Sequence, residues 1–165
     1  MHTGFAMSDF SETSGESVED NWIMALLFAG GKKQKYNEPI AGRTRLMKLL
    51  FLLGQRLPKG EPYFQFEPYK FGPHSSEVLR RLDRLVATGF VQTEPGFGSD
   101  IYGLTPKGVD RSSPFFNSLN PRLRQKIVDV KIQFNAMPLR DLLALVYERF
   151  PSFASQSEYE GPPEE

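Results

Sequence analysis

The chain of 165 residues has no cysteine and only two histidines, and these absences exclude several kinds of site. Without cysteine there are no disulfides and no thiolate metal sites, which favours a reducing, cytoplasmic location. His2 and His74 alone cannot form a two-histidine zinc site or a zinc-protease motif. No apolar run approaches the roughly 20 residues needed to cross a bilayer, so we expect no membrane partner. Residues 1–17 lack the basic start and apolar core of a secretory signal.

Catalytic and cofactor-binding motifs are also missing. Gly30-Gly31-Lys32 resembles the end of a phosphate-binding loop, but Leu26 stands where the upstream glycine is required. Lys33 stands where Ser or Thr would bind magnesium, and Gly96-Phe97-Gly98 lacks the third glycine of a dinucleotide fingerprint. No cluster of carboxylates suggests acid–base catalysis. We therefore expect neither an enzyme, nor a cofactor, nor a metal site.

The net charge of zero conceals a segregation of charge along the chain. Residues 1–20 carry five acids and no base, residues 32–84 carry twelve bases against five acids, and residues 158–165 carry four glutamates. An electropositive body with acidic ends indicates a polyanionic partner such as nucleic acid. The alternative is that the acidic ends only keep a small domain soluble.

Hydrophobic periodicity predicts a mainly α chain with a small β part, of class α+β. Ser17 and Asp20 form a capping pair for a first helix that ends at Gly30-Gly31. Leucines at helical spacing predict a second helix over residues 43–56, and a third over residues 75–88 is ended by Gly89. The other expected elements are a strand at residues 63–66 closed by Pro68, a hairpin of strands at 90–93 and 101–104 with its tip at 95–100, and helices at 121–134 and 138–150. The aromatic residues from Tyr63 to Phe71 are interpreted as core, with stacking on unpaired bases as the alternative.

This order of elements predicts a winged helix-turn-helix, in which a basic recognition helix is followed by a glycine and a β wing. The predicted organisation is a disordered acidic tail at 1–17, a winged-helix domain at 18–112, a helical extension at 113–154 and a disordered acidic tail at 155–165. The extension either pairs with a second copy to give a homodimer or packs back onto the first helix. Both alternatives stay open at this point.

The third helix carries the candidate DNA contacts. Arg80, Arg81 and Arg84 fall within little more than one turn and can reach phosphates or a guanine edge. The alternative is a solvated helix face, partly neutralised by Glu77 and Asp83. The other candidate DNA-binding residues are Arg43, Arg45 and Lys48 on the second helix, His74, Ser75 and Ser76 at the start of the third, and Phe97 and Ser99 at the wing tip. For His74, at this helix N-terminus, phosphate contact and a simple capping role are both possible.

Three segments together resemble a little-characterised group of prokaryotic winged-helix proteins: residues 46–53 (LMKLLFLL), residues 66–75 (FEPYKFGPHS), and residues 82–85 (LDRL) with Gly89. This layout is similar to the Panacea domain of phage-associated proteins and antitoxins, and the helix-to-wing segment resembles that of PadR- and MarR-type regulators. The resemblance covers residues 43–108 and extends weakly to 142–151. It departs at residues 57–74, where helix-turn-helix proteins usually have a short turn.

Residues and resemblance together predict a transcriptional regulator that binds double-stranded DNA. The alternative function is a protein-interaction module of the antitoxin or adaptor type. In that case the acidic N-terminal segment, or the tail after Ser155, would bind a partner protein.

Overall fold

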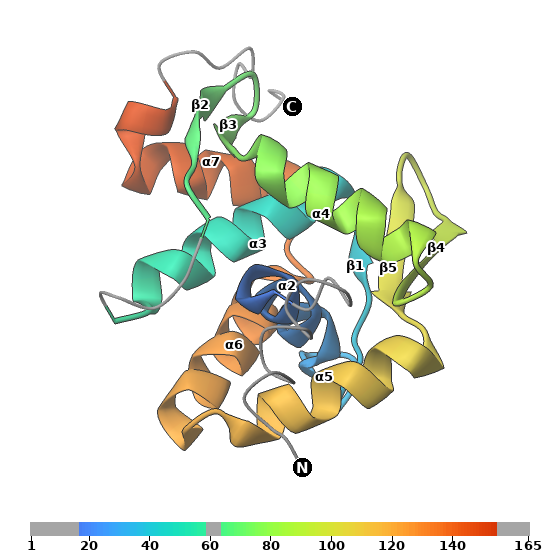
Figure 1. The fold of residues 1–165 in the computed structure, drawn as a ribbon. Helices are drawn as coiled ribbons and strands as arrows, with labels where there is room; N and C mark the ends of the chain where they lie inside the picture. The colour runs from blue at the N-terminus through green and yellow to red at the C-terminus, as the bar shows by residue number, and fades with distance from the viewer. Residues whose placement is uncertain (1–16, 59–63, 155–165) are drawn as a thin grey trace.

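The computed structural model describes residues 17–58 and 64–154, and this part of the chain is α+β, as predicted. The tails expected at 1–17 and 155–165 lie outside the described residues, except for Ser17. None of the described helices is long and apolar enough to span a bilayer. The helices are α2 (Val18–Phe28), α3 (Arg43–Arg56), α4 (Ser76–Ala87), α5 (Pro106–Ser118), α6 (Pro121–Phe134), α7 (Leu139–Arg149) and the 3-10 turn η1 (Pro151–Phe153); the strands are β1 (Ile40–Ala41), β2 (Glu67–Tyr69), β3 (Gly72–His74), β4 (Val91–Pro95) and β5 (Asp100–Leu104) (Figure 1).

Helix α2 lies at the centre of the molecule, between α4 on one side and α5 and α6 on the other (Figure 1). Every residue of the run 22–27 is buried, so this helix has no solvated face over that run. The predicted cap is confirmed, because the Ser17 hydroxyl accepts a hydrogen bond from the Asp20 N–H at 3.0 Å. Helices α4, α5 and α6 and strand β5 all pack against it.

The carboxyl end of α2 is capped by a side chain from α6. The Lys131 Nζ is fully buried and donates to the carbonyl oxygens of Leu26 at 2.7 Å and Ala29 at 2.9 Å. It also donates to the Glu38 carbonyl at 2.7 Å and, more weakly, to that of Leu27 at 3.4 Å. Carbonyls at the end of a helix lack partners within the helix. Here a lysine far away in the sequence donates the missing hydrogen bonds.

The main sheet has three antiparallel strands in the order β1-β5-β4. The predicted hairpin is confirmed, with Val91 opposite Leu104 and Pro95 opposite Asp100. Strand β1 was not predicted, because two residues are too few to show the alternation of a strand. It pairs with the outer side of β5 and places α3 next to the sheet.

The connection between α3 and α4 contains a second hairpin, β2–β3. The prediction of a strand at residues 63–66 is wrong for the described residues 64–66, and Tyr63 lies outside them. The strand lies at Glu67–Tyr69 and includes Pro68, which is tolerated because both strands of a two-stranded sheet are edges. Gly72 has φ +89, a conformation that suits glycine at the turn into β3.

Helix α5 was missed from the sequence, and it crosses the boundary expected between residues 112 and 113. Its start has a clear signal: the Thr105 hydroxyl accepts from the Gly108 N–H at 3.0 Å, and Pro106 occupies the first position. Pro114 and two serines inside the helix obscure the rest of it, since both residue types are poor helix formers.

Helices α6 and α7 pack back onto the same chain. The apolar stripe of α6 is buried, and α6 contacts α2 and α3, while α7 contacts α3 and β3. Phe51 of α3 forms edge-to-face contacts with Phe150 and Phe153, which closes this side of the core. Helix α6 therefore packs back onto the first helix, α2, as in the second alternative, whereas α7 packs onto α3 and β3. The buried stripe residues are Leu123, Ile127, Val130 and Phe134 of α6 and Leu142 and Val146 of α7.

Candidate nucleic-acid interface

Helix α4 forms where the sequence predicts it, because both of its ends are capped. The Ser75 hydroxyl accepts from the Val78 N–H at 3.3 Å. At the other end Gly89 has φ +86, its N–H donates to Val86 O at 3.1 Å, and the Phe90 N–H donates to Leu85 O at 2.9 Å, which is a Schellman motif. The inner face, Val78, Leu82 and Leu85, is buried; the exposed face carries Ser76, Arg80, Asp83, Arg84 and Ala87.

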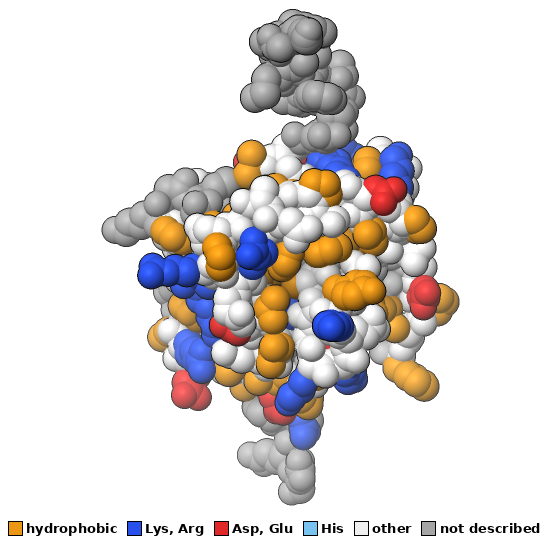
Figure 2. Space-filling model, turned by 90° about the horizontal axis from the view of Figure 1, so that it is seen from below, with side chains coloured by type: hydrophobic (Ala, Val, Ile, Leu, Met, Phe, Trp, Pro, Cys, Tyr) orange, Lys and Arg blue, Asp and Glu red, His pale blue; other side chains and the backbone are white. Residues whose placement is uncertain are grey.

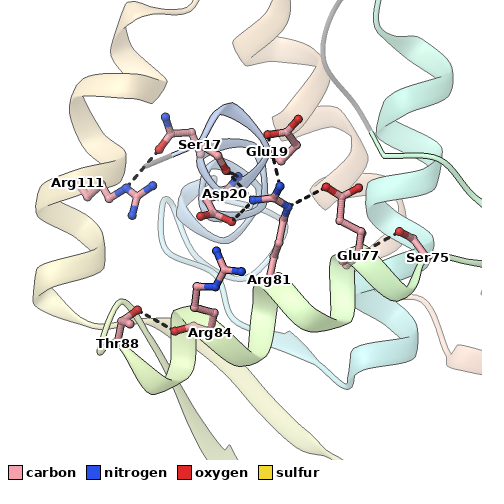
Figure 3. A network of polar contacts seen from close by, with 11 residues as sticks. Ser17, Glu19, Asp20, Ser75, Glu77, Arg81, Arg84, Thr88 and Arg111 are labelled. Atoms are coloured by element: carbon pink, nitrogen blue, oxygen red, sulfur yellow. Dashed lines mark hydrogen bonds and ion pairs between the residues drawn. The ribbon is translucent and has the colours of Figure 1, made fainter. Parts of the chain in front are cut away.

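Arg81 is committed to contacts within the protein, and its assignment as a DNA contact is corrected. Its guanidinium donates to Glu77 at 2.9 Å, to the Asp20 carboxylate at 3.2 Å and to the Ser17 hydroxyl at 2.8 Å (Figure 3). Asp20 is only 1% exposed, so this guanidinium balances a buried charge. Burial acts to lower the pKa of Arg81, but the bonds to Glu77 and Asp20 outweigh it and raise the pKa. Arg81 thus fixes α4 against the start of α2.

Two arginines of α4, Arg80 and Arg84, take no part in the ion pairs of this helix. Glu77 is paired with Arg81, and Asp83 is paired with Arg43 of α3 at 2.8 Å. The side chains of Arg80 and Arg84 have no hydrogen-bond or ion-pair partner within residues 17–58 and 64–154. In Figure 3 the Arg84 side chain leaves α4 beside Arg81, and its backbone carbonyl accepts a hydrogen bond from the Thr88 hydroxyl. The exposed face of α4 therefore carries uncompensated positive charge.

Two of the three basic residues predicted to anchor DNA from α3 do not face solvent. Lys48 is 2% exposed and donates to Pro73 O at 2.8 Å, so its assignment as a DNA contact is corrected. Arg45 is half-buried and donates to the carbonyls of Phe134 at 3.2 Å and Met137 at 2.6 Å, which ties α3 to the end of α6. Burial lowers the pKa of both side chains. Only Arg43 remains at the surface, paired with Asp83.

The residues at the start of α4 divide between buried and exposed positions. Ser75 is 4% exposed and serves as the N-cap, so its assignment as a DNA contact is corrected. Ser76 is exposed at the first position of the helix. His74 is half-buried, with its ring 4.4 Å from that of Tyr69. Burial lowers the pKa of His74, the nearby Lys48 charge lowers it further, and Glu67 acts in the opposite direction.

The wing tip projects fully into solvent. Phe97 is completely exposed, and Ser99 is also exposed. The wing, residues 91–100, contains Glu94 and Asp100 but no lysine or arginine. The wing tip therefore presents an apolar ring and backbone amides to solvent, not cationic side chains.

The interpretation of the aromatic segment as core is only partly correct. Phe64 is buried, but Tyr69 and Phe71 at the tip of the β2–β3 hairpin are 44% and 47% exposed. The β2–β3 hairpin lies beside the start of α4 (Figure 1), and both rings line a cavity there together with Leu79. A possible signal in the sequence was the Tyr69-Lys70-Phe71-Gly72 run, whose polar centre and glycine are typical of a turn.

No protein-family model matches this chain, and comparison with curated proteins likewise gives no match. Within the described residues, no group of three or more acidic or histidine side chains is arranged to hold a metal ion. What the geometry brings together is one exposed helix face with Ser76, Arg80 and Arg84, flanked by two hairpins.

Proposed function

We propose that this chain is a winged-helix protein that binds double-stranded DNA and acts as a transcriptional regulator. The order of elements supports the fold: three helices, α2, α3 and α4, are followed directly by the β4–β5 hairpin, and β1 completes the sheet on the far side of β5. In this arrangement α4 takes the position of the recognition helix and β4–β5 that of the wing. The β2–β3 hairpin is an insertion between the two core helices.

The observation that carries the proposal is the surplus of positive charge on α4. Both acids of the helix are neutralised by other arginines, and Arg80 and Arg84 remain exposed without a partner in the described residues. Guanidinium groups of this kind bind phosphates and guanine edges. Arg80 and Arg84 lie one turn apart, so both can reach one DNA groove while Ser76 contacts the flanking backbone. Phe97 would meet the neighbouring minor groove as an apolar wedge.

Replacing Arg80 and Arg84 together by alanine is expected to weaken duplex binding on the order of 100-fold, since each phosphate or base contact contributes about 1–3 kcal/mol. The plot of log affinity against log salt should become less steep by about 2, because two fewer counterions are released. Fluorescence anisotropy with a labelled pool of random 30-base-pair duplexes, at about 50 to 200 mM salt, measures both quantities.

The matched control removes two bases from a different helix. Arg122 and Lys126 on α6 have no ion pair within the described part of the chain, and Arg122→Ala/Lys126→Ala changes the net charge by the same amount. This control should bind duplex like the wild type, and neither double variant should change the melting temperature. Equal affinity of the Arg80/Arg84 variant and the wild type would reject the interface.

A specific observation also supports the second candidate, a protein-interaction module. Seen from below the view of Figure 1, hydrophobic side chains gather in the middle of one face, with Lys and Arg side chains around them (Figure 2). Exposed apolar patches with a polar rim are typical of protein–protein contacts. Such a face would suit a partner protein or a second copy of the chain. If no duplex is retained even at 50 mM salt, this candidate replaces DNA binding.

A further inference from the structure

A cavity of about 200 Å³ lies between α3, the β2–β3 hairpin and α4. Sites for drug-sized ligands occupy roughly 300–1,000 Å³, so an occupant of this cavity must be smaller. Its walls are mainly apolar, and the half-exposed Tyr69 and Phe71 belong to them. The lining residues are Arg43, Thr44, Met47, Lys48, Tyr69, Phe71, Gly72, His74 and Leu79.

Lys48 is the unusual member of this lining. It is 2% exposed, and of the three N–H groups of its ammonium, one donates to Pro73 O at 2.8 Å. No carboxylate pairs with it among residues 17–58 and 64–154. Burial lowers its pKa to about 8, so the amine is still mainly cationic at neutral pH. A buried charge without a counter-ion is costly to a protein.

The surroundings of Lys48 define the ligand that would compensate this charge. The ammonium would bind an anion. Met47, Leu79 and the two aromatic rings would pack against an apolar group. Arg43, which is paired with Asp83, and His74 also line the cavity, and Glu67 lies near His74. A carboxylate fits better than a phosphate, because it carries less charge into a mainly apolar space.

We propose that this cavity binds a small carboxylate bearing an aromatic or aliphatic group, with the carboxylate on Lys48 and the apolar group between Met47, Leu79 and the ring of Phe71. The site is separate from the exposed arginines of α4, so the proposal does not depend on DNA binding. It does lie next to the start of α4, because the Ser75 N–H is directed at Met47 Sδ at 3.1 Å.

Isothermal titration calorimetry on the full chain tests the site with two probes, phenylacetate and hexanoate, and with their neutral amides. Saturable binding of at least one carboxylate, at least about tenfold tighter than its amide, is expected from loss of a charged hydrogen bond. Inorganic phosphate should bind more weakly than that carboxylate. Absence of saturation by both carboxylates, or equal affinity of acid and amide, would overturn the proposal.

The variant Lys48→Met keeps the length of the side chain and removes the charge. It should retain the fold, because removing the uncompensated buried charge offsets the loss of the one hydrogen bond to Pro73 O. It should lose carboxylate binding at least about tenfold. A variant that folds and still binds with wild-type affinity contradicts the assignment of Lys48.

A second readout on the wild-type protein does not need the variant. The Lys48 charge lowers the pKa of His74, so a bound carboxylate that offsets this charge should raise it. NMR titration of the His74 imidazole with and without saturating phenylacetate or hexanoate measures this shift. An unchanged His74 pKa at saturation would place the ligand elsewhere.

Discussion

Replacing Arg81 by alanine is expected to lower the free energy of unfolding by about 3 kcal/mol. The Asp20 carboxylate is 1% exposed, and Arg81 supplies its cation at 3.2 Å. Removing one partner of a buried pair leaves the other charge uncompensated, and this costs far more than an exposed pair would contribute. The Ser17 hydroxyl and Glu77 lose a partner at the same time. Urea denaturation followed by circular dichroism measures the loss.

The neighbouring residue supplies the matched control. Arg80 lies one position earlier on α4, is exposed and has no partner in the described residues, so Arg80→Ala should change stability by no more than about 0.5 kcal/mol. The two arginines thus separate structure from function, because Arg80 should affect duplex binding and Arg81 should affect unfolding. Identical urea midpoints for the two single variants would show that the Asp20 network does not stabilise the fold.

Replacing Lys131 by methionine is also expected to cost about 3 kcal/mol of stability. Methionine preserves the apolar stem but cannot donate to the four carbonyl oxygens that the Nζ contacts, three of them at the end of α2. A buried acceptor left without a donor costs about 1–3 kcal/mol. Thermal and urea unfolding measure the effect. Lys126→Met on the same helix, at a half-exposed position, should remain within about 0.5 kcal/mol of the wild type.

The cost of Lys131→Met should depend on pH. Burial lowers the pKa of Lys131 to about 7, and the charge of Glu38 opposes that shift. The pKa of a lysine in an unfolded chain is about 10.4. Between these values the unfolded state binds more protons than the folded state, so the Lys131 contribution to stability rises with pH. The neutral amine still donates two N–H groups to the carbonyls. The difference between wild type and variant should therefore grow by about 2 kcal/mol from pH 7 to pH 9. A constant difference would mean that Lys131 keeps its proton throughout.

Local patterns were sufficient to locate α3, α4 and the β4–β5 hairpin. Each of these has a periodic apolar face together with a capping or turn residue next to it, such as Ser75 and Gly89 around α4. Elements without that combination were missed or misplaced. Strand β1 has two residues, β2 contains a proline, and α5 contains Pro114, so their conformations depend on contacts with distant parts of the chain.

For the candidate interface, the sequence located the basic helix but could not show which of its arginines are exposed. Arg80, Arg81 and Arg84 are chemically identical and lie within little more than one turn. Their difference arises because α2 brings Asp20 beside Arg81, across a separation of 61 residues. Lys48 and Lys131 differ from the surface lysines for the same reason, since packing closes over them. Helical spacing is a local property of a chain, whereas burial and ion pairing depend on neighbours that only the folded chain supplies.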